Sequence, residues 1–600
     1  MTKKNVIHII VDALCYNSLQ RKVGNCEVTP FLNSLAKQSV FFERMFSQAP
    51  YTEASQVTLL SGENTLDHGG YLFGNATVKE TIFSKYRKAG YKTLFTYSPY
   101  VYSKAYLRDI DSFYYTRLVS LEPLFMYRLK YYYDISQQRS LSDQEMKVCV
   151  MLLQEALETW KEQCVSILDG SETMALISDW VKDTGYVANV NSVLDGELSK
   201  FYEDPNSYIL QIFENWQDHI LRKMNRQYNA RTELKLYKQL LDVYQPAMER
   251  YQKRYSEILK KHTLDLEYLL GMIFRNKNGI HDARNTFAAY RNHWNDTGLQ
   301  DYLKSIDERA KTEVSINRVF EVYEKDLIDL DAKNELFYAH IHVQDFHLPS
   351  VFHSVDTDDF SMVQDEFAVC FELLEAMDSK YRGNIVADLS ARYCDKKVEL
   401  FYRKMKSMLK NDFVFTVTAD HGFPCYEMPP RPMVYNQTYT EAFHVPFIAC
   451  DGEHVVTYSD IYSNIDGIFA EMQCAGVEPE NPLSRRQYVL CEYGGPGCPD
   501  IGIKPIWYTY IDDRWRISAE CPLTQTFTMD CVKDIYDIRK DPSERKNLLK
   551  FQQNNSEVKK CCDIIRSRHE ELQEKFSGEK FLNMQLNLLE SRNNKWCLKN

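Results

Sequence analysis

Three apolar segments of the chain each end in the side chains that bind divalent cations. The segments 6–12, 337–347 and 413–422 end, in that order, in Asp12, in Asp345 and His347, and in Asp420 and His421. Aspartate oxygen and neutral histidine nitrogen suit a hard or borderline cation, and the adjacent pair Asp420-His421 offers both atoms to one ion. The sequence therefore indicates a metal site, provided that the fold brings the three segment ends together.

A threonine beside the start of an expected helix provides a candidate nucleophile. A turn containing Pro50 leads into a helical run that stops at Gly62, which leaves Thr52 near the helix N-terminus. Free backbone N–H groups and the helix dipole favour an anion there. A hydroxyl ionised by a neighbouring metal could attack phosphorus or sulfur. A helix-capping role would explain a threonine at this position equally well.

The elements that must position these residues follow an α/β pattern. From residue 5 to about 116, and again from about 335, short β-rich runs such as 6–11 and 92–96 alternate with helical stretches such as 30–38. Strands separated by helices of this length predict a mainly parallel sheet covered on both faces. The carboxyl ends of parallel strands lie along one edge of the sheet, where ligands bind.

The chain is too long for one ordinary domain. Its 600 residues predict two or three packed units. Residues 124–348 contain two prolines and six glycines, and apolar residues recur there at helical spacing. The expected division is a discontinuous core of 1–120 and 331–475, a helical insertion of 121–330 and a small C-terminal α+β subdomain of 476–600. Long insertions of this kind usually lie over the site, as a lid or a substrate-selecting element.

Composition limits the partners and the compartment. With 72 Lys and Arg against 84 Asp and Glu, the net charge of −12 argues against a nucleic-acid partner. No apolar run reaches the roughly 18 residues of a membrane span. The first apolar stretch ends at Asp12 after about seven residues, which favours a buried strand over an export signal. Sixteen irregularly spaced cysteines then predict reduced thiols and a cytoplasmic location.

A set of motifs carries a family resemblance. In chain order they are Asp12, Thr-Pro-Phe-Leu-Asn-Ser-Leu-Ala at 29–36, Thr52-Glu-Ala-Ser55 with Leu-Leu-Ser-Gly at 59–62, His68-Gly69, Ala-Gly-Tyr-Lys-Thr at 89–93, His347-Leu-Pro349, Ala-Asp420-His421-Gly422, Val-Pro-Phe at 445–447 and the late segment 535–548. The set resembles the sulfatase-like branch of the alkaline phosphatase superfamily. It covers roughly 1–100, 335–450 and 530–550, whereas 120–330 has no recognisable counterpart.

The resemblance implies an alkaline phosphatase-like α/β sandwich with a metal at the strand ends. Asp12, Asp420 and His421 fall on metal-ligand positions. Thr52 falls on the nucleophile position, where it would also touch the metal. His347 falls on the histidine that contacts the transferred group or the leaving oxygen.

Four further residues are weaker candidates for the same pocket. His342 and His444 would line it or join a second metal site with Asp345. His342 would equally well be a satisfied histidine of the core. Tyr97 lies just after the expected strand 92–96 and would enter the substrate pocket.

The chain departs from sulfatases at the nucleophile. Sulfatases carry Cys or Ser there, followed two residues later by Pro and four later by Arg, and convert the first residue to formylglycine. This chain has Thr52, Ala54 and Gln56. Threonine cannot become that aldehyde, and the missing Arg removes an anion clamp. Ala13 also replaces the usual second aspartate ligand. These departures favour the Thr-nucleophile members, which resemble phosphodiesterases and transferases of phosphoglycerol or phosphoethanolamine.

The expected function is therefore a metal-dependent hydrolase that acts on a phosphate diester or monoester through a covalent threonine intermediate. The alternatives are a sulfuric ester hydrolase without formylglycine, an intracellular phosphoglycerol- or phosphoethanolamine-type transferase in polysaccharide assembly and, from a different class, an inactive binding protein. One divalent cation is expected, with Mn, Zn, Mg and Ca all open and a second ion possible. The substrate would be a small-molecule, glycan or lipid ester. The oligomeric state stays open.

Overall fold

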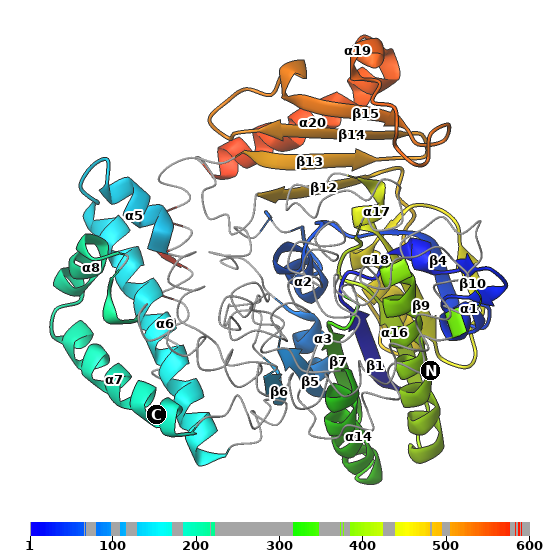
Figure 1. The fold of residues 1–600 in the computed structure, drawn as a ribbon, viewed down its shortest axis with the longest axis horizontal. Helices are drawn as coiled ribbons and strands as arrows, with labels where there is room; N and C mark the ends of the chain where they lie inside the picture. The colour runs from blue at the N-terminus through cyan, green and yellow to red at the C-terminus, as the bar shows by residue number, and fades with distance from the viewer. Residues whose placement is uncertain are drawn as a thin grey trace, which may run out of the picture.

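The computed structural model describes residues 2–64, 66–67, 80–97, 109–115, 129–170, 184–216, 218–221, 316–346, 372–373, 376, 385–423, 439–479, 483–494, 505–576 and five positions between 582 and 590. The main sheet has the order β10 (Val456–Tyr458), β4 (Val40–Phe46), β9 (His444–Cys450), β8 (Phe413–Thr418), β1 (Asn5–Val11), β7 (Phe337–Val343), β5 (Lys92–Tyr97) and β6 (Ser112–Tyr115), and β11 (Tyr462–Ser463) also pairs with β4 (Figure 1). Only β9 runs antiparallel to its neighbours in this sheet.

Helices cover both faces of the main sheet. They are α1 (Pro30–Ala36), α14 (Ile316–Ala332) and α16 (Ile385–Met408) on one face, and α2 (Thr52–Ser61), α3 (Ile82–Lys88) and α18 (Asn464–Cys474) on the other. The alternation of side chains along a strand separates the two layers. Phe415 of β8 packs on Tyr402 of α16, whereas His8, which pairs with the next residue of β8, contacts Glu471 of α18. All seven residues of β1 and of β7 are buried, as expected for strands covered on both faces.

The described part of 121–332 consists of helices. These are α5 (Lys130–Ser136), α6 (Asp143–Asp169), α7 (Thr184–Glu203), α8 (Pro205–Glu214) and α14. In Figure 1, α5 to α8 form a group at one end of the molecule, apart from the sheet. One face of α6 is buried, including Cys149, Leu153 and Leu157, in agreement with the helical spacing of apolar residues in this region. In contrast, α14 packs on β7 and α16. The predicted division into core, insertion and C-terminal subdomain stays a prediction.

The C-terminal part forms a second, antiparallel sheet. Its strands are β12 (Val489–Gly494), β13 (Ile506–Ile511), β14 (Trp515–Cys521) and β15 (Val532–Asp537), with α20 (Ser556–Lys575) packed on β13 and β14 and α19 (Leu549–Gln552) beside β15. The amino-acid pattern predicts one β-like run over 507–517 followed by helices, whereas the structure has two strands joined by a tight turn and a further strand, β15.

The small sheet is tied to the main one beside α2 and α17 (Thr440–Phe443), as Figure 1 shows. The Tyr51 hydroxyl, directly before α2, donates to the carbonyl oxygen of Gly494. Glu544 accepts from the backbone N–H of Thr440 at 3.1 Å, and its other oxygen lies 2.9 Å from the guanidinium of the fully buried Arg516. The C-terminal part therefore holds the segments at the start of α2 and at the start of α17.

The remaining short elements are β2 (Lys22–Val23), β3 (Cys26–Glu27) and the 3₁₀ turns η1 (Tyr16–Ser18) and η6 (Met529–Cys531). The architecture confirms the expected fold class, an α/β sandwich with a mainly parallel central sheet and a small α+β unit. Among the described helices, none combines the length and the apolar composition of a membrane span. No two described cysteines form a disulfide.

Candidate active site

The ends of three adjacent strands place the candidate ligands side by side. Asp12 follows β1, His342 lies at the end of β7, and Asp420 with His421 follows β8, and these strands are neighbours in the order β8-β1-β7. All four side chains are buried. The parallel topology therefore brings together, at the carboxyl ends of these strands, residues that are more than 400 positions apart in the sequence.

Thr52 faces this cluster from the first residue of α2. Its Oγ1 lies 3.4 Å from each carboxylate oxygen of Asp12 and 3.3 Å from Nε2 of His421. The helix cap is Tyr51, and no side-chain hydrogen bond closes this end of α2. The Thr52 hydroxyl is thus directed at the predicted metal ligands rather than at its own helix.

The tautomer of His421 suits a metal ligand. Its Nδ1 lies 2.7 Å from the carbonyl oxygen of Gly422, which accepts a hydrogen bond and so fixes the proton on Nδ1. In the neutral ring Nε2 then carries the lone pair, and it lies 3.5 Å from Asp12 Oδ1 and 3.8 Å from Asp420 Oδ2. A lone pair directed at two buried carboxylates is unfavourable unless a cation lies between them.

Asp420 supports the same conclusion. Its Oδ1 accepts hydrogen bonds from the backbone N–H groups of Ala13 at 3.2 Å and His421 at 2.9 Å. Its Oδ2 is buried and accepts none from the residues that the structure describes. Ligand atoms of Asp12, His342 and Asp420 all lie within 4.8 Å of one another. Buried oxygen and imidazole donors in this arrangement fit a divalent cation.

Two backbone features shape the site. Ala13 adopts a left-handed conformation with φ of 64°, which costs a residue with a side chain about 1–2 kcal/mol and turns its N–H towards Asp420. At Gly422, a Cβ atom would lie 2.1 Å from the carbonyl oxygen of Glu441. The Gly422 N–H also donates to the carbonyl of Ala442 at 2.8 Å. The segment behind His421 is therefore fixed against α17, which Glu544 holds in turn.

Comparison with known proteins identifies the family. The family model described as Sulfatase matches residues 4–144 and 172–477, well over half of the chain. The chain belongs to the sulfatase family. This confirms the family resemblance predicted from the sequence motifs. Enzymes of this family use a metal ion, which the donor set around Asp12 fits. The protein is therefore a sulfatase-superfamily hydrolase.

Solved structures with similar folds include three with distant sequences. A putative sulfatase from Bacteroides thetaiotaomicron is 11% identical, with 96% of this chain and 94% of that chain covered and a TM-score of 0.46. A phosphonate monoester hydrolase from Silicibacter pomeroyi is 13% identical, with 96% and 97% covered and a TM-score of 0.46. A protein in complex with its substrate, D-glucosamine-2-N,6-O-disulfate, is 12% identical, with 96% and 99% covered and a TM-score of 0.40. No curated protein matches the chain.

The weaker candidate residues of this sulfatase-family chain lie in different places in the structure. His342 joins the cluster, with Nε2 at 3.5 Å from Asp12 Oδ2. Asp345 instead accepts the backbone N–H of Ile316 at 2.9 Å, at the start of α14. Among the described residues, no metal-type group contains Asp345 or His444. His347 lies outside the described residues. Tyr97 ends β5, but its side chain also lies outside them.

Two glutamines of the site were not expected from the sequence. Gln344 donates from Nε2 to Asp12 Oδ2 at 3.4 Å. Gln56 is fully buried on α2, one turn after Thr52. A signal for Gln344 was present, because it follows the apolar run of β7 two residues after His342. For Gln56 the sequence indicated only the absence of an arginine.

His444 occupies an aromatic sandwich at the start of β9. Its ring stacks on Tyr16 at 4.1 Å and on Phe46 at 5.0 Å between centroids, and its Nε2 donates to the carbonyl oxygen of Glu43 at 2.8 Å. Loss of hydration lowers the pKa of His444 to about 4, although the Glu43 carbonyl acts in the opposite direction. Burial of the His444 ring therefore favours its neutral form.

This lowered pKa predicts an acid-sensitive fold. In the unfolded chain a histidine has a pKa of about 6.5, so the unfolded state binds a proton first as the pH falls and stability decreases from pH 6.5 towards pH 4. We expect His444 to account for up to about 3 kcal/mol of that decrease. His444→Gln, which keeps a donor for Glu43, should flatten the pH dependence of the unfolding free energy measured by urea denaturation. His340, whose pKa burial lowers well below its usual range, contributes equally in both proteins. A parallel pH dependence in the variant would contradict the assignment.

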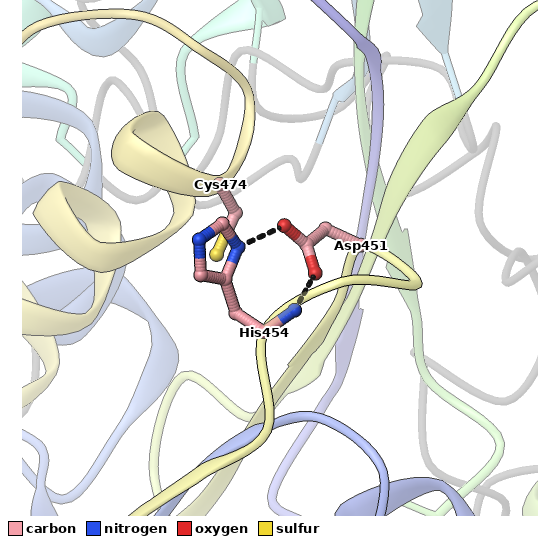
Figure 2. A group of neighbouring side chains, drawn as sticks. All are labelled: Asp451, His454 and Cys474. Atoms are coloured by element: carbon pink, nitrogen blue, oxygen red, sulfur yellow. Dashed lines mark hydrogen bonds and ion pairs between the residues drawn. The ribbon is translucent and has the colours of Figure 1, made fainter. Parts of the chain in front are cut away.

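A second group of metal-type side chains lies at the opposite sheet edge, because β9 runs antiparallel and Asp451 follows it. Figure 2 shows Asp451, His454 and Cys474 together. Nδ1 of His454 lies 2.6 Å from Asp451 Oδ2, and Lys4 Nζ lies 3.5 Å from the same oxygen. Burial raises the pKa of the Cys474 thiol to about 12. Because Lys4 already neutralises the carboxylate and the thiol stays protonated, the ion pair explains this group without a metal.

Proposed function

We propose that this sulfatase-family enzyme hydrolyses a phosphate diester through a covalent phosphothreonine on Thr52. The observation that carries the proposal is the geometry of the Thr52 hydroxyl, which lies 3.3–3.4 Å from Asp12 and His421 in a buried cluster of cation ligands. Threonine cannot be converted to formylglycine, so the hydroxyl itself must act as the nucleophile.

The cation would be held by four side chains of the cluster, Asp12, Asp420, His421 and His342, with Thr52 Oγ1 beside it. A divalent cation bound there would lower the pKa of the hydroxyl and neutralise charge on the ester oxygens. The N-terminus of α2 adds partial positive charge on the same side, because Thr52 is the first residue of that helix. The carboxylate of Asp12 accepts the hydrogen bond of the Thr52 hydroxyl and so orients it.

The reaction has two displacements at phosphorus. In the first, the Thr52 hydroxyl gives up its proton along its hydrogen bond to Asp12, Thr52 Oγ1 forms a bond to phosphorus, the bond to one alcohol breaks, and the departing oxygen takes up a proton. His347, which lies outside the described residues, is predicted to contact the departing oxygen in that step. In the second, water attacks the phosphothreonine, the Thr52 hydroxyl is restored and a phosphate monoester leaves. Burial of the cluster keeps other water away from the nucleophile.

The test is a substrate panel. Bis(4-nitrophenyl) phosphate, 4-nitrophenyl phosphate and 4-nitrophenyl sulfate should be assayed with Mn²⁺, Zn²⁺, Mg²⁺ and Ca²⁺ in turn. We expect the diester to be hydrolysed with the highest kcat/KM. Rapid acid quench should trap protein that carries an aryl phosphate on the peptide containing Thr52. Faster hydrolysis of the sulfate ester than of the diester would overturn the proposed substrate class.

A further inference from the structure

Gln56 is a buried amide that the fold leaves unsatisfied. The side chain is 0% exposed, and neither Nε2 nor Oε1 has a hydrogen-bond partner in the part of the chain that the structure describes. An unsatisfied buried polar group costs about 1–3 kcal/mol, and buried side-chain amides are nearly always bonded. A residue that costs stability in this way indicates a ligand that is absent from the folded chain alone.

Three other described polar side chains of α2 donate hydrogen bonds to backbone carbonyl groups of the same helix. Thr58 Oγ1 donates to the carbonyl oxygen of Ala54 at 3.1 Å, and Ser61 Oγ donates to that of Val57 at 2.6 Å. Ser55 Oγ donates to the carbonyl oxygen of Thr52 at 3.4 Å. Gln56 is thus the exception among the polar side chains that the structure describes on α2.

The position of Gln56 on α2 directs it towards the nucleophile. Residues four apart lie on one face of a helix, with Cβ atoms about 5–6 Å apart, so Gln56 shares the face of Thr52. Helical side chains lean towards the N-terminus. This placement puts the amide of Gln56 within reach of the turn that carries Thr52.

We propose that Gln56 Nε2 donates a hydrogen bond to a non-bridging oxygen of the ester group bound at Thr52, and that this residue selects singly charged diesters over doubly charged monoesters. The inference rests on the proposed function for the identity of the ester. A primary amide offers two donors and no charge. In a buried site each additional negative charge of the ligand needs compensation, and a neutral donor supplies less of it than a guanidinium would.

The test uses Gln56→Met, which keeps the length of the side chain and removes both polar atoms. Because the unsatisfied amide is lost, we expect the variant to unfold at a higher temperature than the wild type. We also expect kcat/KM for bis(4-nitrophenyl) phosphate to fall at least 10-fold, with a smaller loss for 4-nitrophenyl phosphate. Gln56→Leu provides a second apolar variant if the first does not fold. Thr58→Val is the matched control on the same helix and should leave kcat/KM unchanged.

Binding separates this inference from the proposed function. The dissociation constants of dimethyl phosphate and phenyl phosphate should be measured by calorimetry for the wild type and Gln56→Met. The variant could bind dimethyl phosphate more weakly than the wild type while the wild type does not hydrolyse diesters. That result would support the role of Gln56 and overturn the proposed function. A more stable variant with unchanged kcat/KM and unchanged binding would overturn the role of Gln56 and leave the proposed function standing.

Discussion

Thr52→Ala is expected to lower kcat/KM for bis(4-nitrophenyl) phosphate by at least about 10³-fold, because it removes the atom that attacks phosphorus. The loss should appear in kcat, since the cation ligands that hold the ester remain. Thr52 forms no cap on α2, so the substitution should change the unfolding temperature little. Steady-state kinetics and thermal denaturation of the same preparations measure the two effects.

Thr52→Ser provides the matched variant. It keeps a hydroxyl at the same position, 3.3–3.4 Å from His421 and Asp12 in the native protein, so we expect activity within about 10-fold of wild type. The alanine variant should also carry no aryl phosphate after rapid quench. Turnover by Thr52→Ala at the wild-type rate would remove Thr52 from the mechanism and leave the cluster as a cation site alone.

Asp420→Asn is expected to release the bound cation and with it nearly all activity. Asparagine can still accept the backbone hydrogen bonds of Ala13 and His421 through its carbonyl oxygen, so the local backbone should persist. It replaces the buried Oδ2, however, by an NH₂ group that cannot bind a cation. Purified wild type should hold about one divalent ion per chain by elemental analysis, and the variant should hold none.

Chelation gives an independent measure of the same site. A cation that binds only the folded state stabilises it by an amount that grows with its concentration, about 2.7 kcal/mol at 100 times the dissociation constant. Chelation should therefore lower the unfolding temperature of the wild type and leave that of Asp420→Asn unchanged. Asp451→Asn, in the second aspartate-histidine group, is the control and should keep its cation. Loss of metal from Asp451→Asn with retention in Asp420→Asn would reverse the assignment of the two groups.

The helical group α5–α8 belongs to the predicted insertion, and the contacts around the site concern a different part of the chain. The sequence predicts that the insertion lies over the site as a lid or a substrate-selecting element. The described contacts instead connect the C-terminal sheet with the site, through Tyr51 before Thr52 and through Glu544 at the start of α17. Both contacts come from β12 or the segment after β15. We therefore regard the C-terminal part as the element that holds the two site segments in place.

The amino-acid sequence by itself determined the central strands and the residues at their ends. The segments that form β1, β7 and β8 are continuous apolar runs because each strand is buried on both faces, and a polar residue directly after such a run must lie at the sheet edge. Local rules also located α2, which ends at Gly62 in a left-handed conformation. The sequence did not predict the hairpin β13-β14 or the strand β15, because short strands with mixed patterns are stabilised mainly by their partners across the sheet.

Only the tertiary structure decided which histidine joins Asp12. His342 and His444 were equivalent in the sequence, yet His342 lies on the strand beside β1, whereas the ring of His444 stacks between Tyr16 and Phe46. The unsatisfied amide of Gln56 was likewise invisible, because burial and the lack of a partner are properties of the packed molecule. Residue type and spacing specify what a side chain can do, but its neighbours come from segments hundreds of residues away, and these become neighbours only when the sheet has formed.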